Sequence, residues 1–497
     1  MNLDSSLLQT IYPAAAVLAG IFFSLELERL ARPSCPGLSR PLFASALHAG
    51  LLLMAWAVIL LIVRRPVFAL LLVLAGQFLV IQVNNAKYRA LREPFLFSDF
   101  GIFSQTLKHP RLYLPFLGVG RIFLAAAGGA IAVAVGWFVE SPAPHFIACA
   151  GGAAMLGLLL IGIGWTATPR PSFTPERDVA AHGLFTSIAR YWLREKTIAP
   201  VRRTSLPKLP AASHDRPDIV VIQSESFFDA RRLFSGIRRD VLENYDTACA
   251  SAYMHGRLQV PAWGANTMRP EFCFLTGLAS DTLDVHRFNP YRRVARRPIR
   301  ALPAVLREAG YRTACIHPHP ARFFRRDRAF PNLGFEHFMD IREFRNAKKR
   351  GPYTSDEAVT DKLIEELSHA NGPVFLFAIT MENHGPLHLE KVSEEEIKDY
   401  FTVAPPQSCS DLQVYIRHLK NADQQLGRLR SALQARSRPY VLAFYGEHMP
   451  SMPDVYQELG FPDGRTDYFV DSTAGAEQQV VDLEIAELPR RILGLIR

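Results

Sequence analysis

The sequence predicts a membrane-anchored protein in which an α-helical membrane domain precedes an α/β domain with a mainly parallel central sheet. Three observations carry this prediction. Long apolar stretches fill the first third of the chain, short β-rich runs alternate with helical patterns in the remainder, and a segment broken by prolines separates the two parts. We therefore expect a transmembrane domain at 1–165, a linker at 166–216 and a soluble domain at 217–497, which is long enough for one large core.

Five apolar stretches make up the expected membrane domain, each close to the roughly 20 residues that cross a bilayer as a helix. They cover residues 11–25, 42–63, 66–83, 121–139 and 145–164. One such stretch alone can be a buried core helix, but five with almost no internal charge predict five transmembrane helices. No basic segment precedes the first stretch, which argues against a cleaved signal peptide. Gln77 and Gln82 make no convincing ion pathway, which argues against a transporter.

The linker and the charge distribution point to a membrane surface. The segment 184–196 has the pattern of an amphipathic helix that lies at the interface. The net charge is +9, with arginine clusters at 292–297 and 322–328. Beside a membrane, such clusters favour anionic lipid or phosphate over nucleic acid. A solvated basic face explains the first cluster equally well.

Acidic or imidazole side chains follow four predicted strands of the soluble domain. The strand ends are at Glu225, at His317 and His319, at Asn383 and His384, and at Glu447 and His448. A single residue of this kind is more often a cap or a loop hydrogen-bond partner. Because parallel sheets bind ligands beyond the carboxyl ends of their strands, the four ends together predict a ligand-binding edge.

A glycine-containing turn at 261–278 leads into a helix that begins close to Thr267. The first-turn N–H groups favour an anion there, and the Thr267 hydroxyl is a candidate nucleophile and metal ligand. An ordinary N-cap threonine is the alternative. With Glu225, Glu447 and His448, this hydroxyl makes a mixed oxygen and nitrogen set suited to Mn²⁺, Mg²⁺ or Zn²⁺. Phosphoryl chemistry needs such an ion to activate the attacking hydroxyl and to neutralise charge on phosphorus oxygens.

The order of these motifs resembles that of the lipoteichoic acid synthase and phosphoglycerol transferase family, of alkaline phosphatase and sulfatase ancestry. The matching pieces are Glu-Ser-Phe at 225–227, Gly-Ala-Asn-Thr at 264–267 with Glu-Phe at 271–272, a His…Arg-Asp stretch at 317–327, Asn-His at 383–384 and Gly-Glu-His at 446–448. Residues 84–100, after the third span, are similar to a membrane segment of that family. The likeness covers nearly the whole chain and implies an alkaline phosphatase/sulfatase-like fold for 217–497.

The resemblance implies a metal held by Glu225, Thr267, Glu447 and His448, with Thr267 as the nucleophile that becomes covalently phospho-linked. His384 matches the histidine that acts on the leaving group or oxyanion. The expected cofactor is a divalent metal, with Mn²⁺ preferred and Mg²⁺ or Zn²⁺ as alternatives. The family usually has Asp where this chain has Glu447, which leaves the metal preference open.

The resemblance also implies a site for the phosphoglycerol head group. His317 and Arg326 match positions that contact it, and Phe324 takes the place of an aromatic residue that packs there. The implied enzyme is a membrane-bound phosphoglycerol transferase that moves glycerophosphate from phosphatidylglycerol, an anionic phospholipid, to a hydroxyl of a cell-envelope glycan or polymer. It implies no nucleic acid partner.

Two rival functions stay open, and one is disfavoured. A phosphoethanolamine transferase acting on lipid A or a glycan would use the same nucleophile with a different head group. A catalytically inactive membrane scaffold is the alternative from another class. A sulfatase is less favoured, because that branch converts Cys or Ser to formylglycine and this chain has Thr267.

The membrane topology is contested by the charges of the loops. The segment between the third and fourth spans carries five basic residues, whereas the one between the second and third carries only Arg64 and Arg65. The positive-inside rule would place the former segment, and with five spans the soluble domain, in the cytoplasm. The resemblance implies a multi-pass inner-membrane protein with its catalytic domain on the periplasmic or extracellular side. We adopt the second topology, because basic residues also bind lipid head groups.

Overall fold

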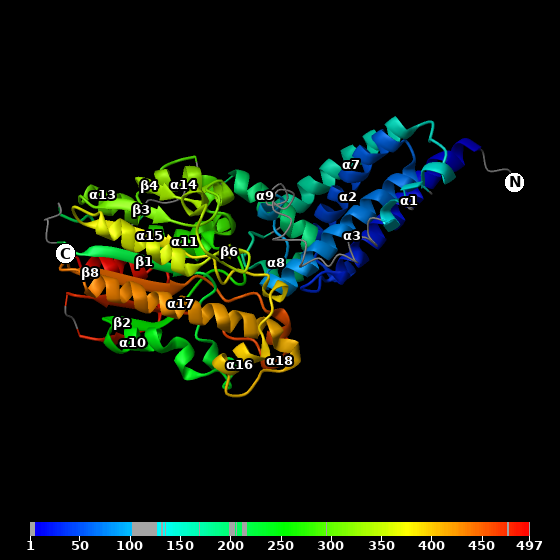
Figure 1. The fold of residues 1–497 in the computed structure, drawn as a ribbon. Helices are drawn as coiled ribbons and strands as arrows, with labels where there is room; N and C mark the ends of the chain where they lie inside the picture. Colours follow the sequence, from blue (N-terminus) through cyan, green and yellow to red (C-terminus); the bar gives the residue numbers. More distant parts are fainter. Residues whose placement is uncertain are drawn as a thin grey trace. The chain divides into compact units, whose positions relative to one another are not determined.

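The computed structural model describes residues 5–101, 127–130, 133–134, 136–167, 169–197, 204, 206–210, 216–294, 296–474 and 477–496. The chain divides into two compact units, Met1–Ile198 and Ala199–Arg497. The first unit is built of helices, and the second is built around a central β-sheet (Figure 1).

Long apolar helices form the first unit. They are α1 (Ser5–Leu27), α2 (Leu42–Val63), α3 (Pro66–Leu91) and α7 (Phe146–Ala167). Helices α2, α3 and α7 are long and apolar enough to cross a membrane, and α1 covers the first predicted stretch. Of the fourth predicted span, 121–139, the structure describes only residues 127–130, 133–134 and 136–139, and the rest lies outside the described residues. The described part of the chain therefore supports a helical membrane region with three candidate spans, and the prediction of five spans is confirmed only to that extent.

Helices α2 and α7 approach each other closely at glycines. A Cβ atom on Gly50 would lie 2.7 Å from the carbonyl oxygen of Gly157, and one on Gly157 would lie 3.0 Å from the carbonyl oxygen of Gly50. In a membrane, where no hydrophobic force drives helices together, small residues stabilise such pairs by allowing close packing.

A buried polar cluster joins one end of these helices to the following segment. Glu28 pairs with Arg40 at 2.5 Å and accepts the backbone N–H of Phe185 at 2.8 Å. Ser24 Oγ donates to Gln77 Oε1 at 2.7 Å, and Gln77 donates back to the Ser24 carbonyl. Gln77 is thus a satisfied contact between helices, which agrees with the prediction that it is no part of an ion pathway.

The segment after α7 packs within the first unit. Helices α8 (Pro175–His182) and α9 (Leu184–Thr197) form there, the second at the predicted amphipathic segment. Leu184 and Ile188 share a cluster with Ile81 and Phe95. The chain that precedes residue 199 therefore lies at the same end of this unit as the loop after α3. Lys87, near the end of α3, is paired with Glu93 and Asp99 after the helix, so its charge is a poor indicator of topology.

A nine-stranded sheet forms the centre of the second unit, in the order β10-β2-β9-β8-β1-β7-β3-β4, with β11 paired to β2. The strands are β1 (Asp218–Ser224), β2 (Met254–Gln259), β3 (Arg312–Ile316), β4 (His337–Met339), β7 (Val374–Ile379), β8 (Tyr440–Gly446), β9 (Thr466–Ser472), β10 (Gln479–Val480) and β11 (Leu483–Glu484). Strands β8, β1, β7, β3 and β4 are parallel neighbours, while β9 runs antiparallel to β8 and β2. The predicted parallel core is confirmed, within a sheet that is mixed overall.

Helices cover both faces of this sheet. One hydrophobic cluster takes residues from α11 (Met268–Thr276), α12 (Tyr291–Val294), α13 (Leu302–Glu308), α14 (Arg326–Leu333) and α19 (Leu488–Gly494), and the other from α10 (Glu243–Ser251), α15 (Asp356–Ser368), α17 (Ser410–Gln434) and α18 (Pro453–Leu459). Ile219 and Val221 belong to the first cluster, whereas Val220 and Ile222 belong to the second. A strand buried on both faces reads as a continuous apolar run, which explains the composition of β1. Helix α16 (Glu394–Tyr400) and a two-stranded sheet of β5 (Lys349–Arg350) and β6 (Tyr353–Thr354) complete the unit.

Candidate active site

The predicted ligand-binding edge is formed by neighbouring strands. Strands β8, β1, β7 and β3 lie side by side, and their carboxyl ends carry the four groups of acid and imidazole residues. Glu225, Glu447 and His448 are all buried, and each offers one ligand atom within 4.8 Å of the others. Glu225 is more than two hundred residues from Glu447 and His448 in the sequence. It meets them because β1 and β8 pair in register, with Ser224 opposite Gly446.

The two carboxylates stand close together in a buried site. His448 Nε2 lies 3.0 Å from Glu447 Oε1 and 3.9 Å from Glu225 Oε1. Burial, and then the nearby charge of Glu447, raise the pKa of Glu225 to about 7. Burial also raises the pKa of Glu447 to about 7. Two buried carboxylates beside an imidazole cost free energy unless a cation compensates them, so this donor set fits a divalent metal ion.

Neighbouring polar groups hold the acidic side chains in place. Gln223 Nε2 donates to Glu447 Oε2 at 2.7 Å, and Tyr445 donates to Gln223 Oε1 at 2.7 Å. Ser226 Oγ donates to Glu225 Oε1 at 2.7 Å. The Oε2 atom of Glu447 is thereby held by Gln223. Sequence reasoning missed Gln223, although a glutamine inside an apolar strand is a signal of a buried polar role.

The backbone carbonyl of the next residue, Met449, orients the ring of His448. Its Nδ1 atom lies 2.9 Å from the carbonyl oxygen of Met449, so Nδ1 carries the proton and Nε2 faces the two carboxylates. Burial lowers the pKa of His448, which favours the neutral form that binds metals.

Thr267 stands at the first turn of α11 and points to the acidic pair. Its Oγ1 atom donates to Glu447 Oε1 at 3.1 Å, and its side chain makes no capping hydrogen bond. Asn266 has a φ of 70° and Gly264 a φ of 68°, and the Gly264 N–H donates to the carbonyl of Met449 at 2.9 Å. This sharp turn brings the hydroxyl to the metal-ligand set. The N-cap alternative is therefore not the arrangement found.

His384 lies on the loop that follows β7. Its Nδ1 atom donates to the Gly385 carbonyl at 2.6 Å, which leaves Nε2 as the basic nitrogen. A positive charge on His384 would lower the pKa values of both Glu225 and His317, so its ring lies close to both groups. The loop is anchored by Glu382, which is 3.1 Å from His418 Nδ1 on α17.

The residues expected at the head group form a buried chain of hydrogen bonds. Arg326 is 1% exposed, and its guanidinium binds both oxygens of Glu271, at 3.2 and 2.8 Å. Its Nη1 atom lies 3.3 Å from His317 Nε2, while His317 Nδ1 lies 3.1 Å from the Ile379 carbonyl. Burial, and then the charge of Arg326, hold the pKa of His317 well below its usual range. Phe324 lies 5.3 Å from the Arg326 guanidinium carbon.

Both nitrogens of His317 and the guanidinium of Arg326 have partners within the protein. We call this pair, together with Glu271, the wall of the site. Its contact with a head group stays a prediction. Glu271, which sequence reasoning did not single out, holds this wall together. Its carboxylate binds Arg326 and also accepts a hydrogen bond from the hydroxyl of Tyr291.

We expect Arg326→Met to lower the free energy of unfolding by about 3–5 kcal/mol, because it leaves Glu271 buried without its partner. The double variant Arg326→Met with Glu271→Gln should recover much of this loss, since no unpaired charge then remains. Thermal and denaturant unfolding of the purified full-length variants measures both effects. A single variant as stable as the parent protein would show that the pair is unimportant.

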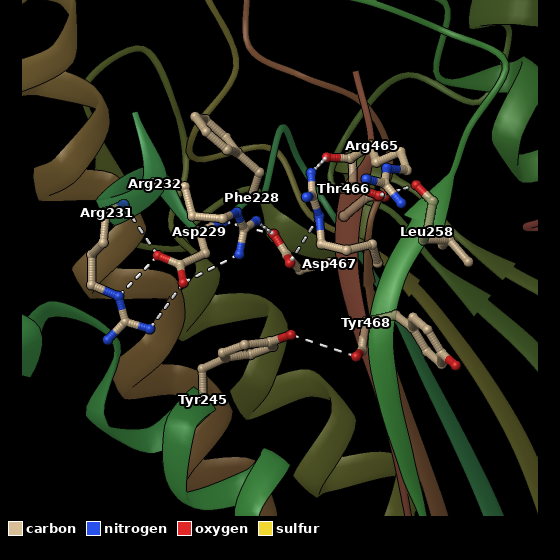
Figure 2. Close-up of polar contacts among 12 residues, drawn as sticks. Phe228, Asp229, Arg231, Arg232, Tyr245, Leu258, Arg465, Thr466, Asp467 and Tyr468 are labelled. Atoms are coloured by element: carbon tan, nitrogen blue, oxygen red, sulfur yellow. Dashed lines mark hydrogen bonds and ion pairs between the residues drawn. The ribbon is translucent and has the colours of Figure 1, made fainter. Parts of the chain in front are cut away.

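A second polar network fixes the segment that follows Glu225 (Figure 2). The Asp229 N–H donates to Asp467 Oδ2 at 2.7 Å, and the guanidinium of Arg232 lies between these two carboxylates. The Asp229 carboxylate also binds Arg231. Because Asp467 belongs to β9, the network ties this segment to the strand that flanks β8.

Gly446 is required where β8 ends, because a Cβ atom there would lie 1.8 Å from the carbonyl oxygen of Phe227. We expect Gly446→Ala to lower the free energy of unfolding by at least about 3 kcal/mol and to separate Glu225 from Glu447. Gly372→Ala is the matched control, because a Cβ at Gly372 meets no atom within 4 Å. Denaturant unfolding compares the two variants, and equal stabilities would contradict the expectation.

Comparisons with known proteins identify proteins similar to this chain. The capsular polysaccharide biosynthesis protein RkpI of Rhizobium meliloti (strain 1021) is 28% identical over 445 residues, which cover 82% of this chain and 77% of that protein. The structure of the phosphoglycerol transferase GacH of Streptococcus pyogenes, in complex with sn-glycerol-1-phosphate, is 24% identical over 56% of this chain and 74% of its own, with a TM-score of 0.46. The lipooligosaccharide phosphoethanolamine transferase A (EptA) of Neisseria meningitidis is 14% identical, yet the match covers 87% of this chain and 88% of that one with a TM-score of 0.56, which shows a shared fold.

The sequence profile of the Sulfatase family matches residues 217–487. This match spans more than half of the chain and includes every clustered site residue described above. The protein therefore belongs to the sulfatase family, within the alkaline phosphatase and sulfatase superfamily.

Proposed function

We propose that this protein is a membrane-bound phosphoglycerol transferase that uses Thr267 as its nucleophile. The observation that carries the proposal is the position of the Thr267 hydroxyl, which hydrogen-bonds to Glu447 Oε1 at 3.1 Å instead of capping its own helix. A hydroxyl held at a helix N-terminus beside buried acidic ligands is placed to attack an anionic phosphodiester.

The reaction has two displacements at phosphorus. A divalent cation bound by Glu225, Glu447, His448 and Thr267 would lower the pKa of the Thr267 hydroxyl and neutralise charge on the phosphoryl oxygens. In the first displacement Thr267 gives its hydroxyl proton to Glu447 Oε1, with which it already hydrogen-bonds. The bond from Thr267 Oγ1 to phosphorus forms, the bond to diacylglycerol breaks, and His384 supplies a proton to the departing oxygen. Glycerophosphate is then attached to Thr267.

In the second displacement an acceptor hydroxyl attacks phosphorus. His384, now neutral, takes the proton of that hydroxyl, and Thr267 Oγ1 leaves and regains its own proton. Two in-line displacements give net retention of configuration at phosphorus. The same histidine thus serves in both directions.

The charge of the pocket wall supports glycerol over ethanolamine as the head group. An ethanolamine ammonium needs a carboxylate partner. Two carboxylates near His317 already have partners: Glu271 is bound by Arg326 and Tyr291, and Asp340 is bound by Arg342. The neutral imidazole of His317 suits an uncharged polyol better than a cation.

The acceptor we propose is a hydroxyl of a cell-envelope glycan or polymer, reached on the periplasmic or extracellular side of the membrane. The similarity to a protein named for capsular polysaccharide biosynthesis supports a glycan. The apolar helices of the first unit would keep the enzyme at the bilayer that contains its lipid donor, which raises the effective donor concentration without a new contact.

In the decisive experiment, the full-length protein is incubated with Mn²⁺ and with mixed micelles that contain either phosphatidylglycerol or phosphatidylethanolamine. Intact-mass measurement and peptide mapping then locate any covalent adduct. A glycerophosphate adduct on Thr267 with release of diacylglycerol is the expected result. A phosphoethanolamine adduct alone would assign the other donor, and failure with both lipids in a protein that binds no metal would support the inactive scaffold.

A further inference from the structure

An aromatic wall stands beside the proposed nucleophile. It consists of Trp263, Tyr456 and Phe461, whose ring centroids are separated by 5.4 Å between Trp263 and Tyr456, 6.4 Å between Trp263 and Phe461, and 5.6 Å between Tyr456 and Phe461. Tyr456 is buried beneath the other two rings, Trp263 is partly exposed, and Phe461 is 54% exposed. The wall therefore has a rigid base and a surface that solvent reaches.

The backbone ties this wall to the catalytic groups. Trp263 lies four residues before Thr267 and pairs with Met449, the residue after His448. The N–H of Gly264 also donates to the Met449 carbonyl. An aromatic side chain at this place is fixed relative to both the nucleophile and the metal-ligand set.

Polar side chains border the wall on the loop that joins α18 to β9. Asp463 binds Arg257 at 2.8 Å and Arg465 at 2.9 Å. The side chains of Asp463 and Arg465 are 45% and 37% exposed. Between them, Gly464 lies against Trp263, where a Cβ atom would be 3.5 Å from the indole ring. Arg465 stands at the start of β9, next to Thr466 (Figure 2).

We infer that this aromatic wall is the acceptor subsite and that it stacks a sugar ring of the glycan that receives glycerophosphate. The inference rests on the proposed function and names the substrate class of its second displacement. The negative face of an aromatic ring attracts the weakly positive C–H face of a pyranose. Carboxylate and guanidinium groups at its border then exchange hydrogen bonds with sugar hydroxyls.

The polar border separates this subsite from a contact with lipid. A surface that inserts among acyl chains excludes charged side chains such as Asp463 and Arg465. A sugar, in contrast, presents an apolar face and polar edges at once, which is the pattern of this surface. The hydroxyl of a stacked ring then reaches the phosphorus on Thr267, where the new bond to phosphorus forms as the bond to Thr267 breaks.

The test measures how glycerophosphate is divided between acceptors. The full-length protein receives phosphatidylglycerol, Mn²⁺ and maltoheptaose, and the readout is glycerophosphate on the oligosaccharide per diacylglycerol released. We expect Phe461→Ala and Phe461→Leu to lower this ratio about tenfold, while Phe461→Tyr retains it. Val480→Ala, which changes another exposed apolar residue on strand β10, should leave the ratio unchanged.

A binding measurement tests the wall without turnover. Trp263 is the one tryptophan of residues 199–497 in the sequence. We expect maltoheptaose to change the fluorescence of the full-length protein and to leave that of the Trp263→Phe variant unchanged. This titration tests the sugar subsite independently of the proposed function. If the protein releases no diacylglycerol, the proposed function fails, but the fluorescence titration still shows whether the sugar binds.

Three results would overturn the inference. Full transfer by Phe461→Leu would show that apolar bulk suffices. An equal loss with glycerol as the acceptor would show that the wall does not recognise a sugar ring. If the Phe461 variants release less diacylglycerol from lipid vesicles but keep the same ratio of transferred glycerophosphate to released diacylglycerol, the aromatic wall contacts the membrane surface instead of a sugar.

Discussion

Thr267→Ala should remove the covalent adduct and lower diacylglycerol release by at least about 1000-fold. The reason is that the variant lacks the oxygen that attacks phosphorus, and activated nucleophiles of this kind contribute several orders of magnitude to the rate. Release of diacylglycerol from phosphatidylglycerol and peptide mass mapping measure the two effects. Thr267→Ser should keep measurable activity, because it retains the hydroxyl.

The structure provides a way to exclude a folding defect in this variant. The Thr267 side chain does not cap α11, so Thr267→Ala should unfold at nearly the same temperature as the parent protein. Thr282→Ala is the matched control, since Thr282 is exposed and bonds only to a local carbonyl among the contacts described. An adduct that persists in Thr267→Ala would place the nucleophile elsewhere.

Glu447→Gln is expected to weaken Mn²⁺ binding by at least about 100-fold and to lower turnover by at least about 1000-fold. Glu447 is fully buried, and its Oε1 atom lies close to both Thr267 and His448, so its negative charge is the one that a cation between them would contact first. Metal content after desalting and titration calorimetry measure the affinity. Glu447→Asp should still bind the ion. Comparing its affinities for Mn²⁺, Mg²⁺ and Zn²⁺ with those of the parent protein shows whether the extra methylene of Glu447 sets the metal preference.

Stability distinguishes a metal ligand from a structural carboxylate here. In the metal-free protein, Glu447→Gln removes one of two buried negative charges and keeps a side chain of the same size, so the melting temperature should not fall. The exposed Glu458→Gln is the matched control for metal binding. A large loss of stability with unchanged metal affinity would make Glu447 a structural residue.

The sequence predicted the parallel core because it is a local property of the chain. Each buried strand reads as a continuous apolar run, and the acid or imidazole that follows marks its carboxyl end. The position of Glu225 directly after β1 and of Glu447 directly after β8 follows from this pattern. The order of the motifs added the family, which the profile match confirms.

Contacts between segments that are distant in the chain could not be predicted from the sequence. Nothing in the local pattern shows that Gln223 reaches Glu447, because this pair depends on the register of β1 against β8. Likewise, Arg326 lies on an arginine-rich segment that reads as a basic surface, but its side chain is enclosed by Glu271.

The sequence by itself determined which residues are candidates for the chemistry of this protein, since residue type and strand-end position are properties of short segments. Tertiary structure alone decided what those residues face. It brought the Thr267 hydroxyl within hydrogen-bonding distance of Glu447, buried His317 and Arg326 against each other, and packed Trp263 beside Phe461. The physical reason is that strand register, burial and the meeting of loops depend on pairings between distant parts of the chain.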